Sequence, residues 1–253
     1  MKGKVLVCGK GGSGKSTVVA LLSRELSTSN RVLVVDNDES NYLLPSLLGL
    51  SSPPDFMNYF GGKRVIFDKL GDLKKGWKLA DLPSGYVSKT QGGNLGILTV
   101  GKIREYGEGC ACPMNALSQR FLESVTLDKG EFVIVDTDAG IEHFGRGVER
   151  GIDLILIVID PSRESINIAK KVSAFGEKIK KPVYFILNRV DEESRSSLLE
   201  SLDPERVKAI IGNDRKILRS GLNGEELDLT ISGIGELAQF IERGTWRDIC
   251  PNQ

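Results

Sequence analysis

Apolar and polar residues alternate in blocks along this chain, and the blocks have two different periods. Short, nearly unbroken apolar runs predict strands that are covered on both faces of a sheet. These predicted strands are Val5–Cys8, Arg31–Val35, Leu95–Val100, Phe132–Val135, Leu154–Ile159, Val183–Leu187 and, with a weaker pattern, Val207–Ile211. Between them, apolar residues at helical spacing predict the helices Lys15–Ser27, Asn115–Ser124, Ser165–Ile179, Glu193–Ser201 and Gly235–Arg243.

This alternation of strand and helix predicts the fold class. Such repeats form an α/β fold with a doubly wound, mainly parallel sheet flanked by helices. At 253 residues the chain is long enough to bury one sizeable core, so we expect a single domain over residues 1–253. Residues 41–91 interrupt the pattern with a Pro-Pro pair, several glycines and mixed charges. We interpret them as an irregular insertion within that domain.

The first predicted strand leads into a glycine-rich stretch that ends just before the first predicted helix. A strand, the pattern G-x-x-x-x-G-K-[ST] and a helix together form the phosphate-binding loop of P-loop nucleoside triphosphatases. The glycines let backbone N–H groups surround an anion. Lys15 is expected to reach the β- and γ-phosphates, and Ser16 to ligate Mg²⁺. The predicted loop comprises Gly9, Lys10, Gly11, Gly12, Ser13, Gly14, Lys15, Ser16 and Thr17.

Aspartates follow two of the predicted strands. Ligands of open α/β sheets bind at the carboxyl ends of strands, so we expect Asp36, Asp38 and Asp136 to face the phosphate loop. Asp136 is expected to hold Mg²⁺ mainly through water, and Gly140 to offer its N–H to the γ-phosphate and to move when that phosphate leaves. Together these groups predict hydrolysis of a nucleoside triphosphate by in-line attack of water. Turn formation at the strand end is the alternative for Asp36 and Asp38.

Lys10 follows the first glycine, where an ordinary phosphate loop needs no lysine. The pattern K-G-G-x-G-K-[ST] resembles the deviant loop of the MinD, ParA and nitrogenase iron protein superfamily. The resemblance implies a nucleotide-sandwich homodimer in which Lys10 crosses to the partner's phosphates and acts as an arginine finger does. It also implies that Asp38 orients or activates the attacking water, whereas Asp36 holds the loop or the water around the metal. A solvated surface charge is the alternative for Lys10.

The residues that follow the predicted strand Val183–Leu187 are compatible with either of two bases, adenine or guanine. In ATPases of this superfamily an asparagine such as Asn188, at the end of a strand, recognises adenine. Asn188-Arg189-Val190-Asp191 also approximates the N-K-x-D motif of GTPases, in which Asp191 would bind guanine. The other motifs favour ATP. The same resemblance places Asn213 and Asp214 in the base pocket.

Two of the four cysteines, Cys110 and Cys112, lie one residue apart. A disulfide across one residue would be strained, and two thiolates are half of a tetrahedral metal site. A second chain related by a two-fold axis can supply the other two ligands. The pattern therefore indicates a metal shared at a dimer interface, with incidental thiols as the alternative. Cys8 is interpreted as a buried apolar residue, and Cys250 as a tail residue without a partner.

The phosphate loop, the segment G-x-x-C-x-C-P and the run from Asp138 to His143 together resemble the CooC-type nickel-insertion ATPases that mature carbon monoxide dehydrogenase. This resemblance implies ATP and Mg²⁺ as cofactors and Ni²⁺ or Zn²⁺ bound at Cys110 and Cys112. It further implies delivery of the metal to carbon monoxide dehydrogenase apoprotein. His143, the only histidine, is expected to transmit the nucleotide state rather than to ligate metal. Asp191 departs from the pattern and leaves the choice of nucleotide in doubt.

Composition argues against two other classes of partner. Lys and Arg number 34, as do Asp and Glu, so the formal charge is zero and nonspecific nucleic-acid binding is not expected. The longest apolar run is too short to span a bilayer, and no signal segment precedes the first strand, so we expect a cytoplasmic protein without membrane contact. The rival functions are a MinD- or ParA-like positioning ATPase that acts on membrane or DNA, and a redox ATPase with an iron–sulfur cluster.

Overall fold

The computed structural model describes residues 1–73, 76–104, 112–140 and 147–247, and its centre is one eight-stranded sheet. The strand order is β3-β4-β2-β5-β1-β6-β7-β8. Neighbouring strands pair in parallel, except that β3 runs antiparallel to β4. The strands are β1 (Gly3–Gly9), β2 (Arg31–Asn37), β3 (Ser88–Lys89), β4 (Leu95–Thr99), β5 (Glu131–Thr137), β6 (Leu154–Ile159), β7 (Val183–Val190) and β8 (Val207–Gly212).

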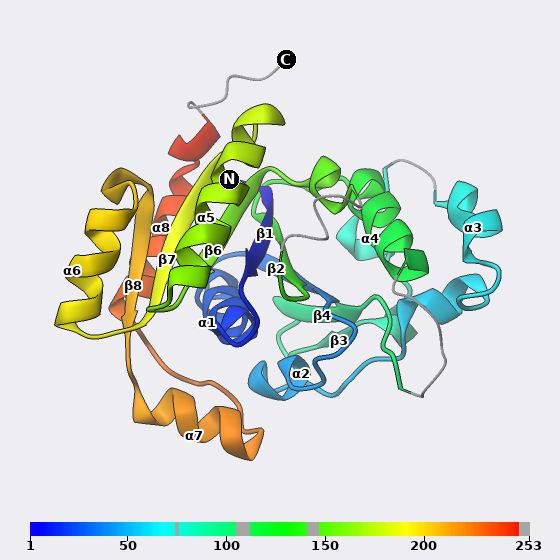
Figure 1. The fold of residues 1–253 in the computed structure, drawn as a ribbon. Coiled ribbons are helices and arrows are strands. Elements are labelled where there is room, and N and C mark those ends of the chain that lie inside the picture. The colour runs from blue at the N-terminus through cyan, green and yellow to red at the C-terminus, as the bar shows by residue number, and fades with distance from the viewer. Residues whose placement is uncertain (74–75, 105–111, 141–146, 248–253) are drawn as a thin grey trace.

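Helices cover both faces of this sheet (Figure 1). The α-helices are α1 (Lys15–Ser27), α2 (Leu44–Leu47), α3 (Ile66–Lys69), α4 (Cys112–Ser124), α5 (Arg163–Lys178), α6 (Glu192–Ser201), α7 (Arg215–Asn223) and α8 (Ser232–Arg243). Single-turn 3-10 helices span Phe56–Phe60, Leu70–Asp72, Leu79–Asp81, Ser84–Tyr86, Val148–Gly151, Pro204–Arg206 and Thr245–Arg247. Within the described residues, no helix is both long and apolar enough to cross a membrane.

Alternation along the central strand divides the core into two layers. Successive side chains of a strand point to opposite faces of a sheet. Val5 and Val7 of β1 accordingly pack with α1, α2 and α8, whereas Leu6 and Cys8 pack with α4, α5 and α6. All four side chains are fully buried. This double burial explains why the strands appear in the sequence as continuous apolar runs.

The predicted fold class is confirmed. Each predicted strand is present, and α1 and β6 have the predicted bounds. Both β2 and β5 extend past the apolar runs to Asn37 and Thr137, so Asp36 and Asp136 lie within strands rather than after them. The prediction was incomplete, because it missed α7 and, within residues 41–91, the short elements α2, α3 and β3. In α7, Leu218 and Leu222 are 62% and 77% exposed, and Figure 1 shows α7 projecting from one end of the molecule.

Residues 41–91 form short helices beside the β2–β4 half of the sheet. A cluster of aromatic rings centred on Phe56 organises part of this segment. Phe56 lies 5.3 Å from both Phe60 and Phe121 of α4, measured between ring centroids. Edge-to-face contacts of this kind add to the stability that burial provides. This aromatic part of the segment is therefore packed on α4, the helix that begins at Cys112, whereas α2 packs with α1 on the other face of the sheet.

Candidate functional site

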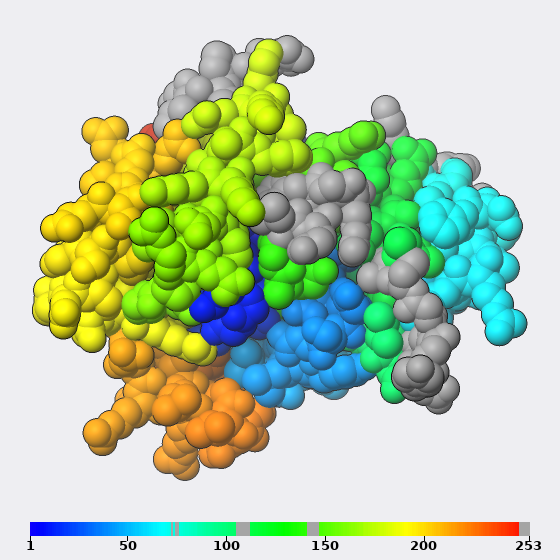
Figure 2. Space-filling model, in the orientation of Figure 1, coloured from blue at the N-terminus to red at the C-terminus, as the bar shows by residue number. Residues whose placement is uncertain are grey.

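The stretch between β1 and α1 forms a tight loop at the carboxyl end of the sheet. Gly9, Gly12 and Gly14 have φ values of 149°, 76° and 95°, which side chains rarely adopt. A Cβ at Gly14 would lie 2.3 Å from Nδ2 of Asn188, so glycine is required there. Figure 2 shows the dark-blue N-terminal part of the chain at the surface, between yellow-green and light-blue segments.

The loop is closed around a buried lysine. Lys15 is 7% exposed, and its Nζ donates a hydrogen bond to the Lys10 carbonyl at 3.3 Å. The Ser13 N–H donates to the same carbonyl at 3.2 Å. Lys15 begins α1, so its ammonium and the positive end of the helix dipole lie together. The loop therefore has the positive charge and the N–H groups that bind phosphate.

Ser16 and Asp136 meet below this loop. The Ser16 hydroxyl donates to Oδ2 of Asp136 at 2.5 Å, and Nδ2 of Asn41 donates to the same hydroxyl at 2.6 Å. Burial raises the pKa of Asp136 to about 7, partly opposed by the Ser16 hydrogen bond. Oδ1 of Asp136 is buried and makes no hydrogen bond within the described residues. These hard oxygen ligands fit a Mg²⁺ ion.

The two aspartates at the end of β2 have different surroundings. Oδ1 of Asp38 accepts from the Ser40 N–H at 2.9 Å, from the Ser40 hydroxyl at 2.7 Å and from the Asn41 N–H at 3.2 Å. Asp36 is fully buried, and its Oδ2 lies 2.7 Å from Nζ of Lys102. Burial raises the pKa of Asp36 to about 6 against the opposing effect of Lys102. Asp38 therefore lies in a turn that also carries Asn41, whereas Asp36 is part of a buried ion pair.

Lys10 is held within its own chain. Its Nζ lies 2.8 Å from Oδ2 of Asp160 and donates to the Ser162 hydroxyl at 3.0 Å. Both Asp160 and Ser162 follow β6, the neighbour of β1 in the sheet. Burial alone would raise the pKa of Asp160, but hydrogen bonds from Lys10, Ser162 and Ser165 hold that pKa below its usual value. The side chain is thus engaged, which differs from the solvated surface charge considered as the alternative.

Gly140 also contacts the phosphate loop. Its N–H donates to the Gly9 carbonyl at 3.1 Å, and its φ of 94° favours glycine. The N–H that the sequence assigns to a γ-phosphate is therefore bonded to the loop in this conformation. It can reach a phosphate only after this bond opens.

A cavity of about 620 Å³ lies beside the loop, at the carboxyl ends of β7 and β8. Its wall includes Thr17, Asn188, Asn213 and Asp214, so the structure brings together the residues predicted to surround the base. Nδ2 of Asn188 donates to the Ser13 carbonyl at 2.7 Å. Asp191 instead caps α6 through the Ser194 N–H at 2.9 Å and does not line this cavity. The Asp191 carboxylate, which the guanine interpretation requires, is therefore not part of this wall.

The predicted cysteine site is only partly described. Cys112 is exposed and is the first residue of α4. Cys110, His143 and Cys250 lie outside the described residues. Burial raises the pKa of the Cys8 thiol to about 12, so this cysteine is chemically inert. Across the described parts of the chain, no three His, Cys, Asp or Glu side chains are grouped to hold a metal ion.

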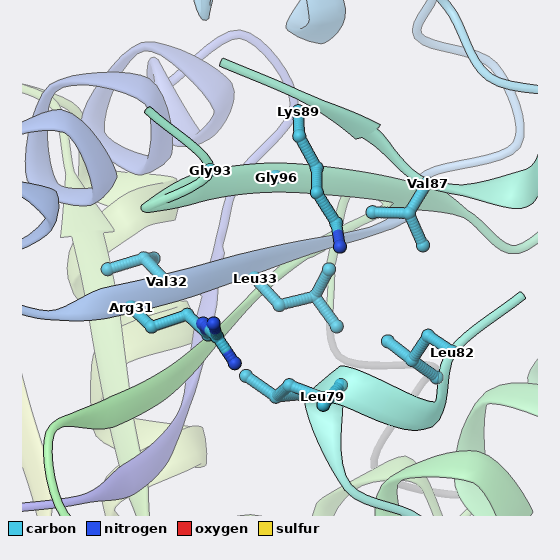
Figure 3. A pocket seen from close by; sticks show the side chains of 10 residues that line it. Arg31, Val32, Leu33, Leu79, Leu82, Val87, Lys89, Gly93 and Gly96 are labelled. Atoms are coloured by element: carbon cyan, nitrogen blue, oxygen red, sulfur yellow. The ribbon is translucent and has the colours of Figure 1, made fainter. Parts of the chain in front are cut away.

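A smaller cavity of about 210 Å³ lies at the amino ends of β2 and β4, far along the strands from the phosphate loop (Figure 3). In this view Lys89 extends down toward Leu33, and the side chain of Arg31 ends close to Leu79. None of the predicted site residues lines this cavity. It does not belong to the candidate site.

Four residues that contact predicted site residues were not identified from the sequence: Asn41, Lys102, Asp160 and Ser162. Asn41 opens the segment interpreted as an irregular insertion, and Lys102 shows only as one lysine after a strand. Asp160 does follow a predicted strand directly, which is the signal that identified Asp36 and Asp136. The same rule applied to each strand would have found Asp160.

Comparison with known proteins agrees with this geometry. The family profile described as the CobQ/CobB/MinD/ParA nucleotide binding domain matches residues 4–227. The chain is 44% identical to the uncharacterized ATP-binding protein MJ0084 of Methanocaldococcus jannaschii, covering 95% of this chain and 100% of that protein. It is 31% identical to the carbon monoxide dehydrogenase accessory protein CooC of Rhodospirillum rubrum, covering 75% of this chain and 80% of CooC.

Solved structures show the same fold. The septum site-determining protein MinD of Pyrococcus horikoshii, complexed with Mg-ADP, superimposes with a TM-score of 0.71. The two chains are 21% identical, and the alignment covers 97% of this chain and 98% of MinD. At this identity the likeness concerns the fold alone.

Proposed function

This chain belongs to the CobQ/CobB/MinD/ParA nucleotide-binding family, and from this premise we propose that it is a Mg²⁺-dependent ATPase that acts as a homodimer to deliver a metal ion. The observation that best supports ATPase activity is the hydrogen bond from the Ser16 hydroxyl to Asp136 at 2.5 Å, directly below the phosphate loop. It joins a predicted Mg²⁺ ligand to a buried carboxylate that comes from another strand. One domain over residues 1–253 carries the activity.

The residues of the candidate site have separate roles in the proposed hydrolysis. Lys15 and the loop N–H groups bind the β- and γ-phosphates, while Asp38 orients the water that attacks the γ-phosphorus in line. Ser16, and Asp136 through water, would hold Mg²⁺, which would neutralise charge on the phosphate oxygens. Lys10 of each subunit leaves Asp160 and stabilises the charge that develops on the partner's γ-phosphate. ADP and phosphate are the products.

Adenine is the base that the cavity beside the loop fits best. Asn188, Asn213 and Asp214 line that cavity, whereas Asp191 is engaged at the start of α6. The GTP alternative required the Asp191 carboxylate to bind the base. The relative from Methanocaldococcus jannaschii is likewise described as an ATP-binding protein.

The proposed cargo is Ni²⁺, with Zn²⁺ as a second metal that thiolates bind well. Cys110 and Cys112 of two subunits supply four thiolates across the dimer axis. CooC of Rhodospirillum rubrum is a carbon monoxide dehydrogenase accessory protein, which supports the same class of apoprotein as client. Hydrolysis releases Gly140 and Lys10 from the γ-phosphate, changes the metal site and releases the ion to that client.

Metal stoichiometry and oligomeric state, measured together, test this proposal. We expect about one Ni²⁺ per two chains in the ATP-bound state, and loss of the ion in Cys110→Ser/Cys112→Ser. Cys250→Ser is the matched control, because it makes the same change at the tail cysteine. Metal binding that survives the double substitution would exclude metal delivery at these thiols. Nucleotide-dependent dimers without bound metal would favour the positioning ATPase.

A further inference from the structure

Lys102 is a buried lysine that the proposed hydrolysis does not use. Its side chain is 4% exposed, and its Nζ lies 2.7 Å from Oδ2 of Asp36. The same ammonium donates to the carbonyls of Asp38 and Asn41. A buried ammonium is tolerated only when its charge is paired and its donors are satisfied. Two carbonyl groups accept hydrogen bonds from this ammonium and the Asp36 carboxylate pairs its charge, so Lys102 is held at one position.

The backbone around Lys102 is bonded to the same segment. The Val100 N–H donates to the Asp36 carbonyl at 3.0 Å, and the Ile103 N–H donates to the Glu39 carbonyl at 3.1 Å. The Tyr42 hydroxyl donates to the Ile103 carbonyl. Residues 100–104 therefore lie along residues 36–42, in line with the pairing of β4 and β2. They lead directly into the sequence that contains Cys110.

A second contact reaches the other end of the cysteine segment. Nδ2 of Asn37 donates to Oδ1 of Asn115 at 3.2 Å, and both side chains are buried. Asn115 lies in the first turn of α4, three residues after Cys112. Residues 36–42 thus contact the chain on both sides of the two cysteines.

The same residues 36–42 also contact the nucleotide loop. Asn41 donates to the hydroxyl of Ser16, the predicted Mg²⁺ ligand, and its N–H donates to the Asp38 carboxylate. A rearrangement of Ser16 and Asp38 around Mg-ATP would therefore act on the carbonyls of Asp38 and Asn41. Lys102 donates to both carbonyls, so it would respond to the same rearrangement.

We propose that Lys102 is a positioning residue that makes Cys112, at the start of α4, respond to the bound nucleotide. This inference rests on the proposed function, in which nucleotide state controls the metal site. Asp36, Asp38 and Asn41 form one group with the Lys102 ammonium. Gly101, directly before Lys102, lies against Met114 of α4, since a Cβ on it would be 2.9 Å from the Met114 sulfur. A movement of the group is passed in this way to the start of α4, where Cys112 lies. Without Lys102, the connection depends on a few backbone bonds and on Asn37.

Alkylation of Cys112 by iodoacetamide measures this response without any metal. The background variant is Cys110→Ser/Cys250→Ser, in which Cys112 and the buried, unreactive Cys8 are the remaining thiols. The alkylation rate is compared for the nucleotide-free, Mg-ADP and Mg-AMPPNP states. We expect the rate to differ about five-fold or more between nucleotide states, as for a typical coupling of two sites. Lys102→Met should bring the ratio of rates close to one while the variant still binds nucleotide.

A second variant serves as the control for misfolding of Lys102→Met. Lys102→Met alone leaves the Asp36 carboxylate buried and unpaired, whereas Asp36→Asn/Lys102→Met removes both charges. Lys89→Met changes an exposed lysine of β3 in the same way and should leave the ratio unaltered. A background ratio of one, or a background ratio retained in the double variant, would overturn the inference. So would loss of nucleotide binding in both Lys102 variants, because Lys102 would then belong to the nucleotide site.

Metal binding separates this inference from the proposed function. If nucleotide alters Cys112 reactivity through Lys102 but no metal binds, the inference stands and metal delivery fails. If nucleotide changes metal affinity equally in the wild type and in Asp36→Asn/Lys102→Met, metal delivery stands and the inference is wrong. The two outcomes therefore cannot be confused.

Discussion

Asp160→Asn is expected to strengthen the nucleotide-bound dimer. The proposed dimer needs Lys10 at the partner's phosphates, yet in this chain its Nζ lies 2.8 Å from Asp160. Each subunit must therefore break this ion pair before the dimer closes. The variant removes the charge that holds Lys10, while the asparagine oxygen can still accept the hydrogen bonds that Ser162 and Ser165 make at 2.6 Å.

The size of the effect follows from the exposure of the pair. Exposed ion pairs contribute about 0.2 to 1 kcal/mol. The Lys10 and Asp160 side chains are 21% and 16% exposed, so we assign this pair to the upper end of that range, about 1 kcal/mol. Two subunits break two pairs, which totals about 2 kcal/mol per dimer. Since 1.4 kcal/mol is a factor of ten, the dimer Kd should fall roughly 30-fold.

Sedimentation velocity with Mg-AMPPNP measures this Kd directly. Ser165→Ala is the matched control, because it removes one hydrogen bond to Asp160 without touching Lys10 and should leave the Kd nearly unchanged. Added salt should reduce the difference between wild type and Asp160→Asn, since it screens the pair. A dimer that is equally tight or weaker in Asp160→Asn would refute the idea that this contact opposes dimerisation.

Three further predictions concern single residues of the site. Asp38→Asn should lower single-turnover ATP hydrolysis about 10²- to 10⁴-fold with ATP binding retained, and unaltered turnover would exclude its role at the attacking water. Burial raises the pKa of Asp136 from 3.8 to about 7, so its contribution to stability is fully present below 3.8 and is lost as pH rises through about 7. Urea unfolding of the nucleotide-free protein should therefore show wild type losing stability relative to Asp136→Asn over this range, and a constant difference would contradict this. Asn188→Ala removes the 2.7 Å hydrogen bond to the Ser13 carbonyl and should lower the free energy of unfolding by about 1 to 3 kcal/mol. An unchanged midpoint of denaturant unfolding would show that this bond does not stabilise the loop.

Sequence and structure agree best where the pattern that predicts an element lies entirely within contiguous residues. The strands of the buried sheet appear as apolar runs because both faces are covered, and the loop before α1 appears through its glycines and Lys15. The signal fails where apolar residues are not buried. The sequence analysis did not identify α7, in which Leu218 and Leu222 remain exposed.

The motifs indicated which residues lie at the candidate site, but they did not indicate which groups those residues bond to. Lys10, Asn188 and Gly140 were all placed at the nucleotide from their positions in motifs. The structure shows that their present partners are Asp160, the Ser13 carbonyl and the Gly9 carbonyl. A motif indicates how a residue contacts a bound ligand. It gives no information on which group of the protein that residue contacts when the ligand is absent.

The sequence by itself determined the long strands of the sheet, most of the helices packed on it and the candidate phosphate loop, because these features depend on neighbouring residues and on their period. Only the tertiary structure decided which distant charges meet. Lys10 reaches Asp160 because β1 lies beside β6, and Lys102 reaches Asp36 because β4 lies beside β2. Strand order results from the packing of the whole sheet, so contacts that depend on it cannot be derived from any single stretch of the chain.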